Sequence, residues 1–84
     1  MYVYKSEILE ELARHGLRTL DGTSPERLRD AVRDLYKYEI RRLKARLLAG
    51  EFQKQEYAGK VIELRRLYVV LSIPTPFWTR NTGE

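Results

Sequence analysis

The sequence predicts an all-α domain of three helices, in which a long antiparallel helical hairpin carries a C-terminal tail that packs on it. Three observations predict this class. The segment Thr23-Ser24-Pro25-Glu26 is a strong helix start, about 25 residues without a helix breaker follow it, and Gly50 then separates this stretch from a second apolar repeat. We expect helices at about residues 5–15, 25–49 and 54–71.

The first expected helix has a candidate cap at each end. Ser6 can accept a hydrogen bond from the first turn, and Glu7 next to it interacts favourably with the helix dipole. Gly16 is suited to the left-handed conformation that ends many helices. The apolar stripe of this helix consists of Ile8, Leu9 and Leu12.

The second expected helix has two possible caps. Either Ser24 caps it with Pro25 in the first helical position, or Thr23 caps it and Glu26 closes a capping box. Steps of 100° per residue place most of its apolar side chains on one broad face, made of Leu28, Ala31, Val32, Leu35, Tyr36, Ile40, Leu43 and Leu47. The opposite face carries a basic stripe of Arg33, Lys37, Arg41 and Lys44.

The third expected helix and the tail carry the remaining apolar residues. A heptad-like seam is formed by Tyr57, Val61, Leu64, Tyr68 and Leu71. Pro74 and Pro76 prevent the helix from continuing. Ile73, Phe77 and Trp78 are too apolar to remain in water, so we expect them to pack over the bundle or over a neighbouring subunit. We expect residues 79–84 to fray.

Composition limits the class of protein. Eighty-four residues fit one domain, residues 1–84. The chain has no cysteine, and therefore no disulfide and no thiolate metal site. No apolar run approaches the ~20 residues of a membrane span, so we expect a cytoplasmic protein without a membrane partner.

The sequence offers no catalytic arrangement. Its one histidine, His15, stands at the end of the first helix, where a charge interaction with the helix dipole explains it better than catalysis. No glycine-rich phosphate loop and no metal-ligand spacing occur. We therefore expect a non-enzyme without a cofactor, a metal or a small-molecule substrate.

The positive charge lies mainly on the hairpin. The chain carries 16 basic and 12 acidic residues, and residues 35–66 alone hold nine basic and four acidic ones, a net +5. Arginine beside tyrosine suits phosphate contact and base stacking. Candidate contacts to nucleic acid are Arg33, Lys37, Arg41, Lys44, Arg65 and Arg66. The ordinary overall charge favours the simpler interpretation, which is a solvated surface over core tyrosines.

Charged residues also interrupt the apolar face of the second helix. Glu39 and Arg42 lie three residues apart and can meet, and Arg46 follows one turn later. Two interpretations stay open: an ion pair within the chain, or a polar lock that fixes the register of a homodimer. The candidate interaction residues are Glu39, Arg42, Arg46, Tyr68, Phe77 and Trp78.

A local pattern adds to the interaction hypothesis. It consists of Leu43 and Leu47, Gly50 with Phe52 two residues later, the pair Glu56-Tyr57, and then Lys60 and Leu64. Residues 43–67 resemble the short helical hairpins called SHOCT domains, with glutamine at position 53 where those hairpins carry a capping threonine. The resemblance implies an interaction or oligomerisation role and brings no catalytic residue. We therefore expect a protein–protein interaction or self-assembly module, with a nucleic-acid-binding accessory protein as the alternative.

Overall fold

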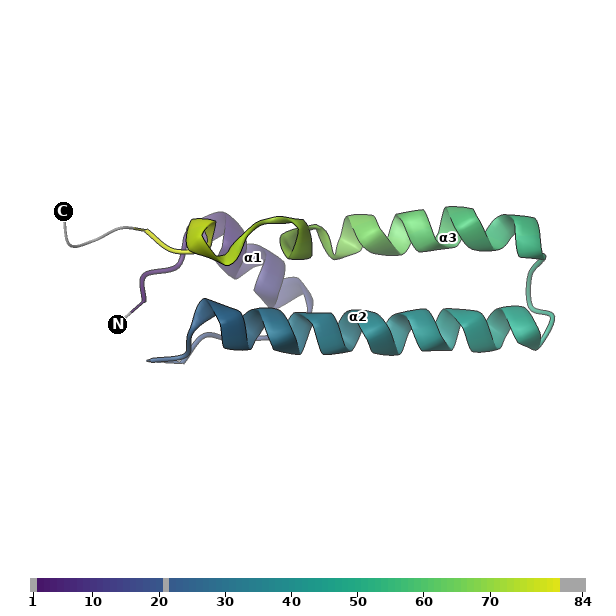
Figure 1. Ribbon diagram of the computed structural model, residues 1–84, viewed down its shortest axis with the longest axis horizontal. Helices are drawn as coiled ribbons and strands as arrows, with labels where there is room; N and C mark the ends of the chain where they lie inside the picture. Colours follow the sequence, from purple (N-terminus) through teal and green to yellow (C-terminus); the bar gives the residue numbers. More distant parts are fainter. Residues whose placement is uncertain (1, 21, 81–84) are drawn as a thin grey trace.

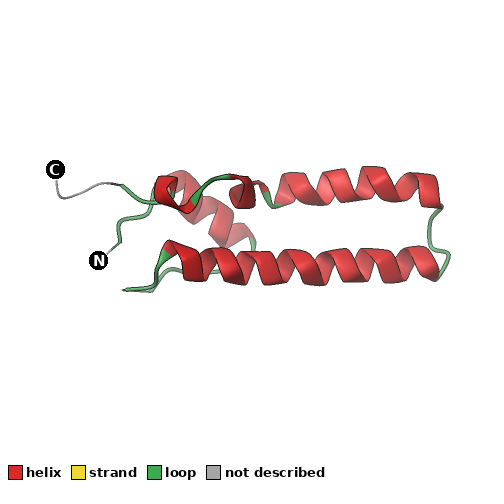
Figure 2. Cartoon of the chain, in the orientation of Figure 1, coloured by secondary structure: helices red, strands yellow, loops and turns green. Residues whose placement is uncertain are grey.

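A computed structural model describes residues 2–20 and 22–80 of the chain. They form three α-helices, α1 (Ser6–Arg14), α2 (Pro25–Leu48) and α3 (Lys54–Leu67), followed by two 3₁₀ helices, η1 (Val69–Ser72) and η2 (Thr75–Phe77). The only strand-like pairing among the described residues is one antiparallel bridge between Tyr4 and Thr79. The all-α class predicted from the sequence is confirmed (Figure 2).

Helices α2 and α3 lie side by side along the length of an elongated molecule that measures 54 × 18 × 16 Å. In Figure 1 they are joined at one end by the turn around Gly50, and α1 lies near the other end, behind the start of α2 and the 3₁₀ helices η1 and η2. The half that contains α1 therefore has three layers of helix, whereas the half near Gly50 has only α2 and α3. We call the second half, residues 39–66, the distal arm.

The hydrophobic core lies almost entirely in the half that contains α1. Ile8 and Leu12 of α1 belong to one buried cluster with Leu28 and Val32 of α2. The other members of the cluster are Tyr4, Tyr68, Val70 and Trp78. In the distal arm, the only buried side chain is Leu43. The apolar face predicted for α2 is thus used fully in one half of the molecule and only partly in the other.

Two glycines end helices as the sequence predicts. Gly16 and Gly50 have φ angles of 75° and 78°. Residues that carry a side chain rarely adopt such positive φ angles. After Gly16, the N–H of Leu17 donates to Leu12 O at 2.9 Å, and after Gly50 the N–H of Glu51 donates to Arg46 O at 3.1 Å. These bonds close a Schellman motif at the end of each helix, and the Gly50 motif reverses the chain direction.

The helix starts agree with the sequence prediction at α2 and differ from it at α1. Ser24 Oγ accepts a hydrogen bond from the Arg27 N–H at 3.3 Å, and Pro25 follows in the first helical position, so Ser24 rather than Thr23 is the cap. At α1 the prediction that Ser6 is the cap is wrong. Ser6 is itself the first helical residue, and Lys5, which has no capping side chain, precedes it.

We expect Ser24→Ala to lower the free energy of unfolding by about 1 kcal/mol, because it removes an N-cap acceptor. Ser6→Ala is the matched control, and its effect should be within about 0.5 kcal/mol of zero because no cap is lost. Urea denaturation followed by circular dichroism measures both values. Equal destabilisation by the two substitutions would contradict this assignment of the caps.

Helix α3 ends at Leu67, four residues before the predicted end at Leu71. The N–H of Tyr68 is shared between Leu64 O at 3.2 Å and Arg65 O at 3.1 Å, so the last turn already tightens toward the 3₁₀ form. The next residues follow the tighter η1 helix, which places Tyr68 and Val70 in the core. The predicted seam thus continues into the core on a different backbone geometry.

The tail packs on the helical bundle, and its last described residues pair with the start of the chain. Trp78 is completely buried, and its carbonyl oxygen accepts a hydrogen bond from the Lys5 N–H at 3.0 Å. The Arg80 N–H donates to Val3 O at 2.7 Å. The fraying expected from residue 79 onward therefore does not include Thr79 and Arg80, and the remainder of that range, 81–84, lies outside the described residues.

Candidate functional site

The distal arm exposes apolar surface that the rest of the chain leaves uncovered. None of the 14 residues of α3 is buried. Ile62 of the arm is 50% exposed, and Leu67 and Val69, just beyond the arm, are 63% and 43% exposed. The seam residues Tyr57, Val61 and Leu64 are only half-buried, although α3 packs against α2 and Leu64 also packs against the core. A helix normally buries one face, so the exposed apolar surface of the arm is a candidate binding site.

Three of the predicted interaction residues line a shallow groove of about 250 Å³ between α2 and α3. The groove, which we call the distal groove, is lined by Glu39, Arg42, Leu43 and Arg46 of α2 and by Lys60, Glu63, Leu64 and Leu67 of α3 or its end. Its charged residues have both signs, and they surround a leucine floor.

The ion pair between Glu39 and Arg42 does not form. Among the described residues, Glu39 has no ion-pair partner, and the Arg42 guanidinium lies over the Tyr38 ring at 5.9 Å instead. Because Arg42 is exposed and Glu39 only half-buried, solvent reduces the cost of leaving both unpaired. The interpretation as an ion pair within the chain is therefore wrong for these two residues.

Arg46 contributes to the hairpin turn. Its Nε donates to Glu51 Oε1 at 3.2 Å, and its guanidinium lies 5.6 Å from the centre of the Phe52 ring. Lys60 Nζ approaches the same ring at 5.0 Å. Phe52 thus folds back across the turn between two cations, and the Gln53 N–H donates to the Glu56 carboxylate at 2.8 Å to start α3. These contacts hold the turn in shape.

Tyr68 is buried where the two halves of the molecule meet. Its ring stacks on His15 with 4.1 Å between the ring centres and meets the edge of Tyr36 at 5.3 Å. Burial raises the pKa of the Tyr68 phenol above its usual range, and the Glu39 carboxylate raises this pKa further. Tyr68 is therefore a packing residue that forms one wall of a surface hollow, and only a small part of it is accessible to a partner.

The two aromatic residues of the tail have different environments. Trp78 is 0% exposed, and its Nε1 donates to Ile73 O at 2.8 Å, so its own chain covers it completely. Trp78 is therefore not available as a contact residue, and its prediction as one is corrected. Phe77 is 58% exposed, with Lys5 Nζ 5.7 Å from its ring centre. Of this pair, only Phe77 is available at the surface.

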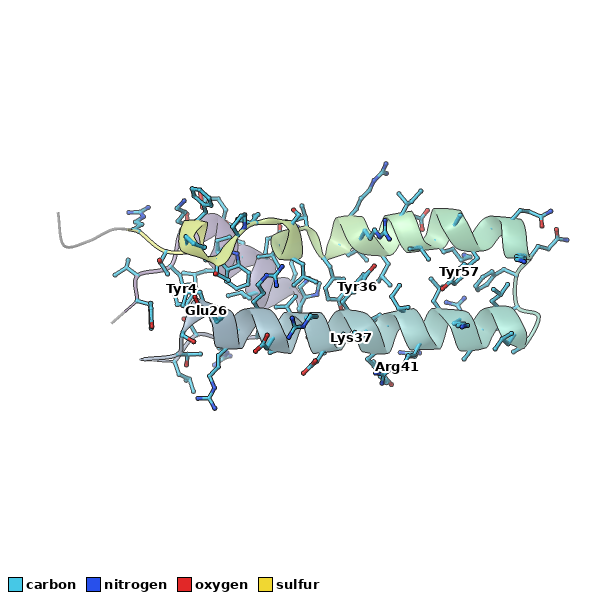
Figure 3. The ribbon with its side chains drawn as sticks, in the orientation of Figure 1. Tyr4, Glu26, Tyr36, Lys37, Arg41 and Tyr57 are labelled. Carbon is cyan, nitrogen blue, oxygen red and sulfur yellow. The ribbon has the colours of Figure 1, made fainter. Side chains whose placement is uncertain are left out.

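The predicted basic stripe is a solvated face of α2. All four of its residues are exposed, namely Arg33, Lys37, Arg41 and Lys44. Arg33 donates to the Asp30 carboxylate at 2.7 Å, which neutralises part of the stripe. Figure 3 shows Arg41 on the side of α2 that points away from α3, whereas Tyr36 and Tyr57 lie between the two helices. The fold therefore does not gather the stripe with the tyrosines.

Arg65 and Arg66 lie in a different place, beside an open hollow of about 520 Å³. We call it the basic hollow. Its lining consists of Tyr36 of α2, then Ile62, Arg65 and Arg66 of α3, and finally Tyr68, Val69, Leu71 and Ser72. Arg41 and Arg42, which are adjacent on α2, do not line it, so this hollow does not join them with Arg65 and Arg66.

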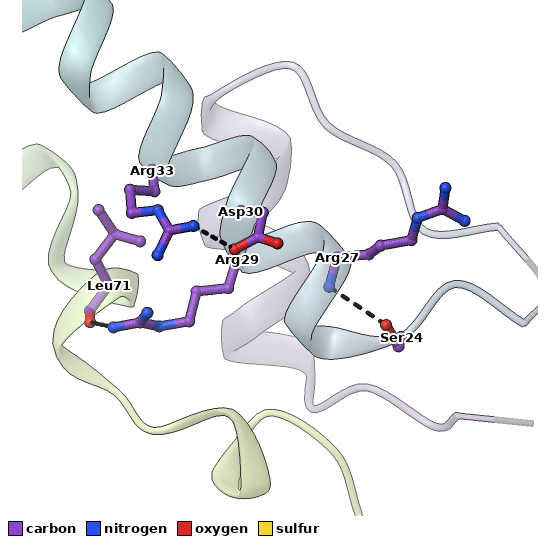
Figure 4. A network of polar contacts seen from close by, with 6 residues as sticks. All are labelled: Ser24, Arg27, Arg29, Asp30, Arg33 and Leu71. Carbon is purple, nitrogen blue, oxygen red and sulfur yellow. Dashed lines mark hydrogen bonds and ion pairs between the residues drawn. The ribbon is translucent and has the colours of Figure 1, made fainter.

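Two contacts that shape this surface have no counterpart in the sequence pattern. The His15 Nε2–H donates to Leu67 O at 2.9 Å, and Arg29 Nη2 donates to Leu71 O at 3.0 Å (Figure 4). Both donors bind carbonyl groups 52 and 42 residues away, and backbone acceptors leave no trace in a residue pattern. The exposure of Ile62 and Val69 was not predicted either, because an apolar repeat alone does not indicate which of its residues stay exposed.

Comparison of the chain with protein-family models, with curated proteins and with solved structures gave no match. Among the described residues, no three His, Asp or Glu side chains are grouped so that they could hold a metal ion. In the same part of the chain, no helix combines the length and the apolar character needed to cross a membrane. The physical properties of the surface therefore carry the functional argument.

Proposed function

We propose that this chain is a non-enzymatic protein–protein interaction module that acts in the cytoplasm and binds its partner with the distal arm. The observation that carries the proposal is that α3 buries none of its 14 residues. An amphipathic helix in a finished domain covers its apolar face, and here only α2 covers it. A partner helix laid on the arm would complete the packing that α1 supplies in the other half.

Other features support this role. His15, the only histidine of the chain, is engaged with Leu67 O and with the Tyr68 ring, so it is not free to act as a general base. The resemblance of residues 43–67 to SHOCT-type hairpins suggests the same kind of function. Phe52, Arg46 and Lys60 stabilise the turn, and a preformed arm loses little conformational entropy when a partner binds.

Site-specific photocrosslinking in the cells that produce the chain tests the proposal. We expect Ile62→p-benzoylphenylalanine to give a crosslinked protein that mass spectrometry identifies, because Ile62 lies at the open face of the arm. Lys37→p-benzoylphenylalanine, on the solvated stripe, is the matched control and should give none. A product of two chains of 10.0 kDa each would identify the module as self-associating.

Two outcomes would contradict the proposal. The first is the absence of any crosslink at Ile62, and the second is equal crosslinking at Ile62 and Lys37. The alternative, a nucleic-acid-binding accessory protein, draws support from the exposed stripe, whose charge Asp30 partly neutralises. It requires binding to DNA or RNA that persists at about 100 mM salt and weakens when stripe residues are replaced.

A further inference from the structure

We propose that the basic hollow binds an acidic amphipathic helix of a partner protein. This inference rests on the proposed function and adds the chemistry of the partner. The only charged side chains that line the hollow are Arg65 and Arg66, and no carboxylate lines it. Neither guanidinium forms an ion pair with a described carboxylate, so both are free to bind one supplied from outside.

The floor of the basic hollow is apolar and suits a helix. Ile62 and Val69 are about half-exposed, with Tyr36 beside them. Ile62 lies on α3 and Val69 begins η1, so the floor is formed by two consecutive elements of the chain. A partner helix that lies in a groove presents a row of apolar anchors at positions i, i+3, i+4 and i+7.

The edge of the basic hollow is fixed by polar contacts in the half that contains α1. Arg29 is bound to Leu71 O at 3.0 Å, and Arg33 is bound to Asp30 at 2.7 Å (Figure 4). Leu71 belongs both to this hollow and to a neighbouring one that includes Arg29 and Asp30. The positive charge left for an incoming ligand is therefore that of Arg65 and Arg66.

Charge and surface chemistry favour this occupant over two others. A second copy docked about a twofold axis would bring the same two arginines face to face, which is repulsive. Single-stranded nucleic acid stacks its bases on accessible aromatic rings. Here Tyr68 is buried against Tyr36 and His15, and the exposed floor is aliphatic.

Fluorescence anisotropy with two designed peptides tests the inference. Each peptide has about 14 residues, roughly four helical turns, with leucine at the i, i+3, i+4 and i+7 positions. One carries glutamate on its polar face and the other carries lysine. We expect the glutamate peptide to bind the full chain at least about tenfold more tightly than the lysine peptide, and its affinity to fall between about 50 and 200 mM salt.

Matched variants locate the contact. Arg65→Glu together with Arg66→Glu should weaken binding of the glutamate peptide by at least about tenfold, because attraction becomes repulsion. Lys37→Glu together with Arg41→Glu makes the same change in net charge on the solvated stripe, and it should weaken binding by less than about twofold. Ile62→Asp, at an exposed position, should weaken binding without unfolding the chain.

The results that overturn the inference are distinct. They are equal binding of the two peptides, no binding of the glutamate peptide, or equal loss in both charge-reversed variants. Single-stranded DNA that binds through Arg65 and Arg66 in place of the peptide would also overturn it. If Ile62 crosslinks an identified protein while the glutamate peptide fails to bind, the interaction function stands and the acidic helix is wrong. If both experiments fail, the proposed function fails as well.

Discussion

Replacing Trp78 by alanine is expected to lower the free energy of unfolding by about 3–5 kcal/mol. Trp78 is completely buried, and its Nε1 donates to Ile73 O at 2.8 Å. The substitution leaves a cavity between the tail and the bundle and deprives the Ile73 carbonyl of its donor. Because a chain of this size is stable by only about 5–10 kcal/mol, the variant should lose a large part of its stability. Urea denaturation followed by circular dichroism measures the loss.

Phe77→Ala is the matched control for Trp78→Ala, because it removes the neighbouring aromatic ring of the same tail. Phe77 is 58% exposed, so we expect a loss below about 1 kcal/mol. The difference between the two variants isolates the effect of burial from that of aromatic content. Similar stability in both variants, or a Trp78→Ala chain as stable as the unmodified one, would contradict the core described for this tail.

The second large effect concerns local stability. We expect amide protons around Leu43 and along α3 to exchange with solvent at least about 100-fold faster than those around Val32, after correction for intrinsic rates. Val32 is completely buried in the core cluster that also contains Ile8 and Leu12, whereas Leu43 is the only buried side chain of the distal arm. The arm can therefore open while the half that contains α1 stays folded. Hydrogen exchange followed by nuclear magnetic resonance measures both groups under the same conditions.

Two controls make the exchange experiment decisive. Measurements at several protein concentrations separate protection within one chain from protection by self-association, which would rise with concentration. The variant with Arg65→Glu and Arg66→Glu changes the surface of the arm without changing the core around Val32. Equal protection of the distal arm and the core at low concentration would show that the chain opens only as a whole.

The parts of the fold that sequence analysis predicted correctly depend on local chemistry. Ser24 with Pro25 starts α2, and Gly16 and Gly50 end helices by accepting a left-handed backbone. Each of these signals acts within a few residues, so the sequence pattern contains it. The broad apolar face of α2 was also correct, because the helical period alone determines which residues share a face.

What the sequence did not predict depends on contacts between distant residues. The early end of α3 follows from the way Tyr68 and Val70 enter the core, and the burial of Trp78 follows from its pairing with the chain start. The candidate site likewise has a part that the local sequence predicts and a part that depends on contacts between distant residues. The exposure of Arg65 and Arg66 follows from their charge, whereas the exposure of the apolar Ile62 depends on how α3 packs against the rest of the chain.

The pairing of Tyr4 with Thr79 has a practical consequence for experiments on this chain. Residues 3 and 80 are held together by a backbone hydrogen bond of 2.7 Å, at the end of the molecule opposite to Gly50 (Figure 1). A donor and an acceptor dye attached at these two positions would transfer energy efficiently only while the core is intact. Such a chain reports its own folding continuously, and the dyes stay away from the surface that we expect to bind a partner.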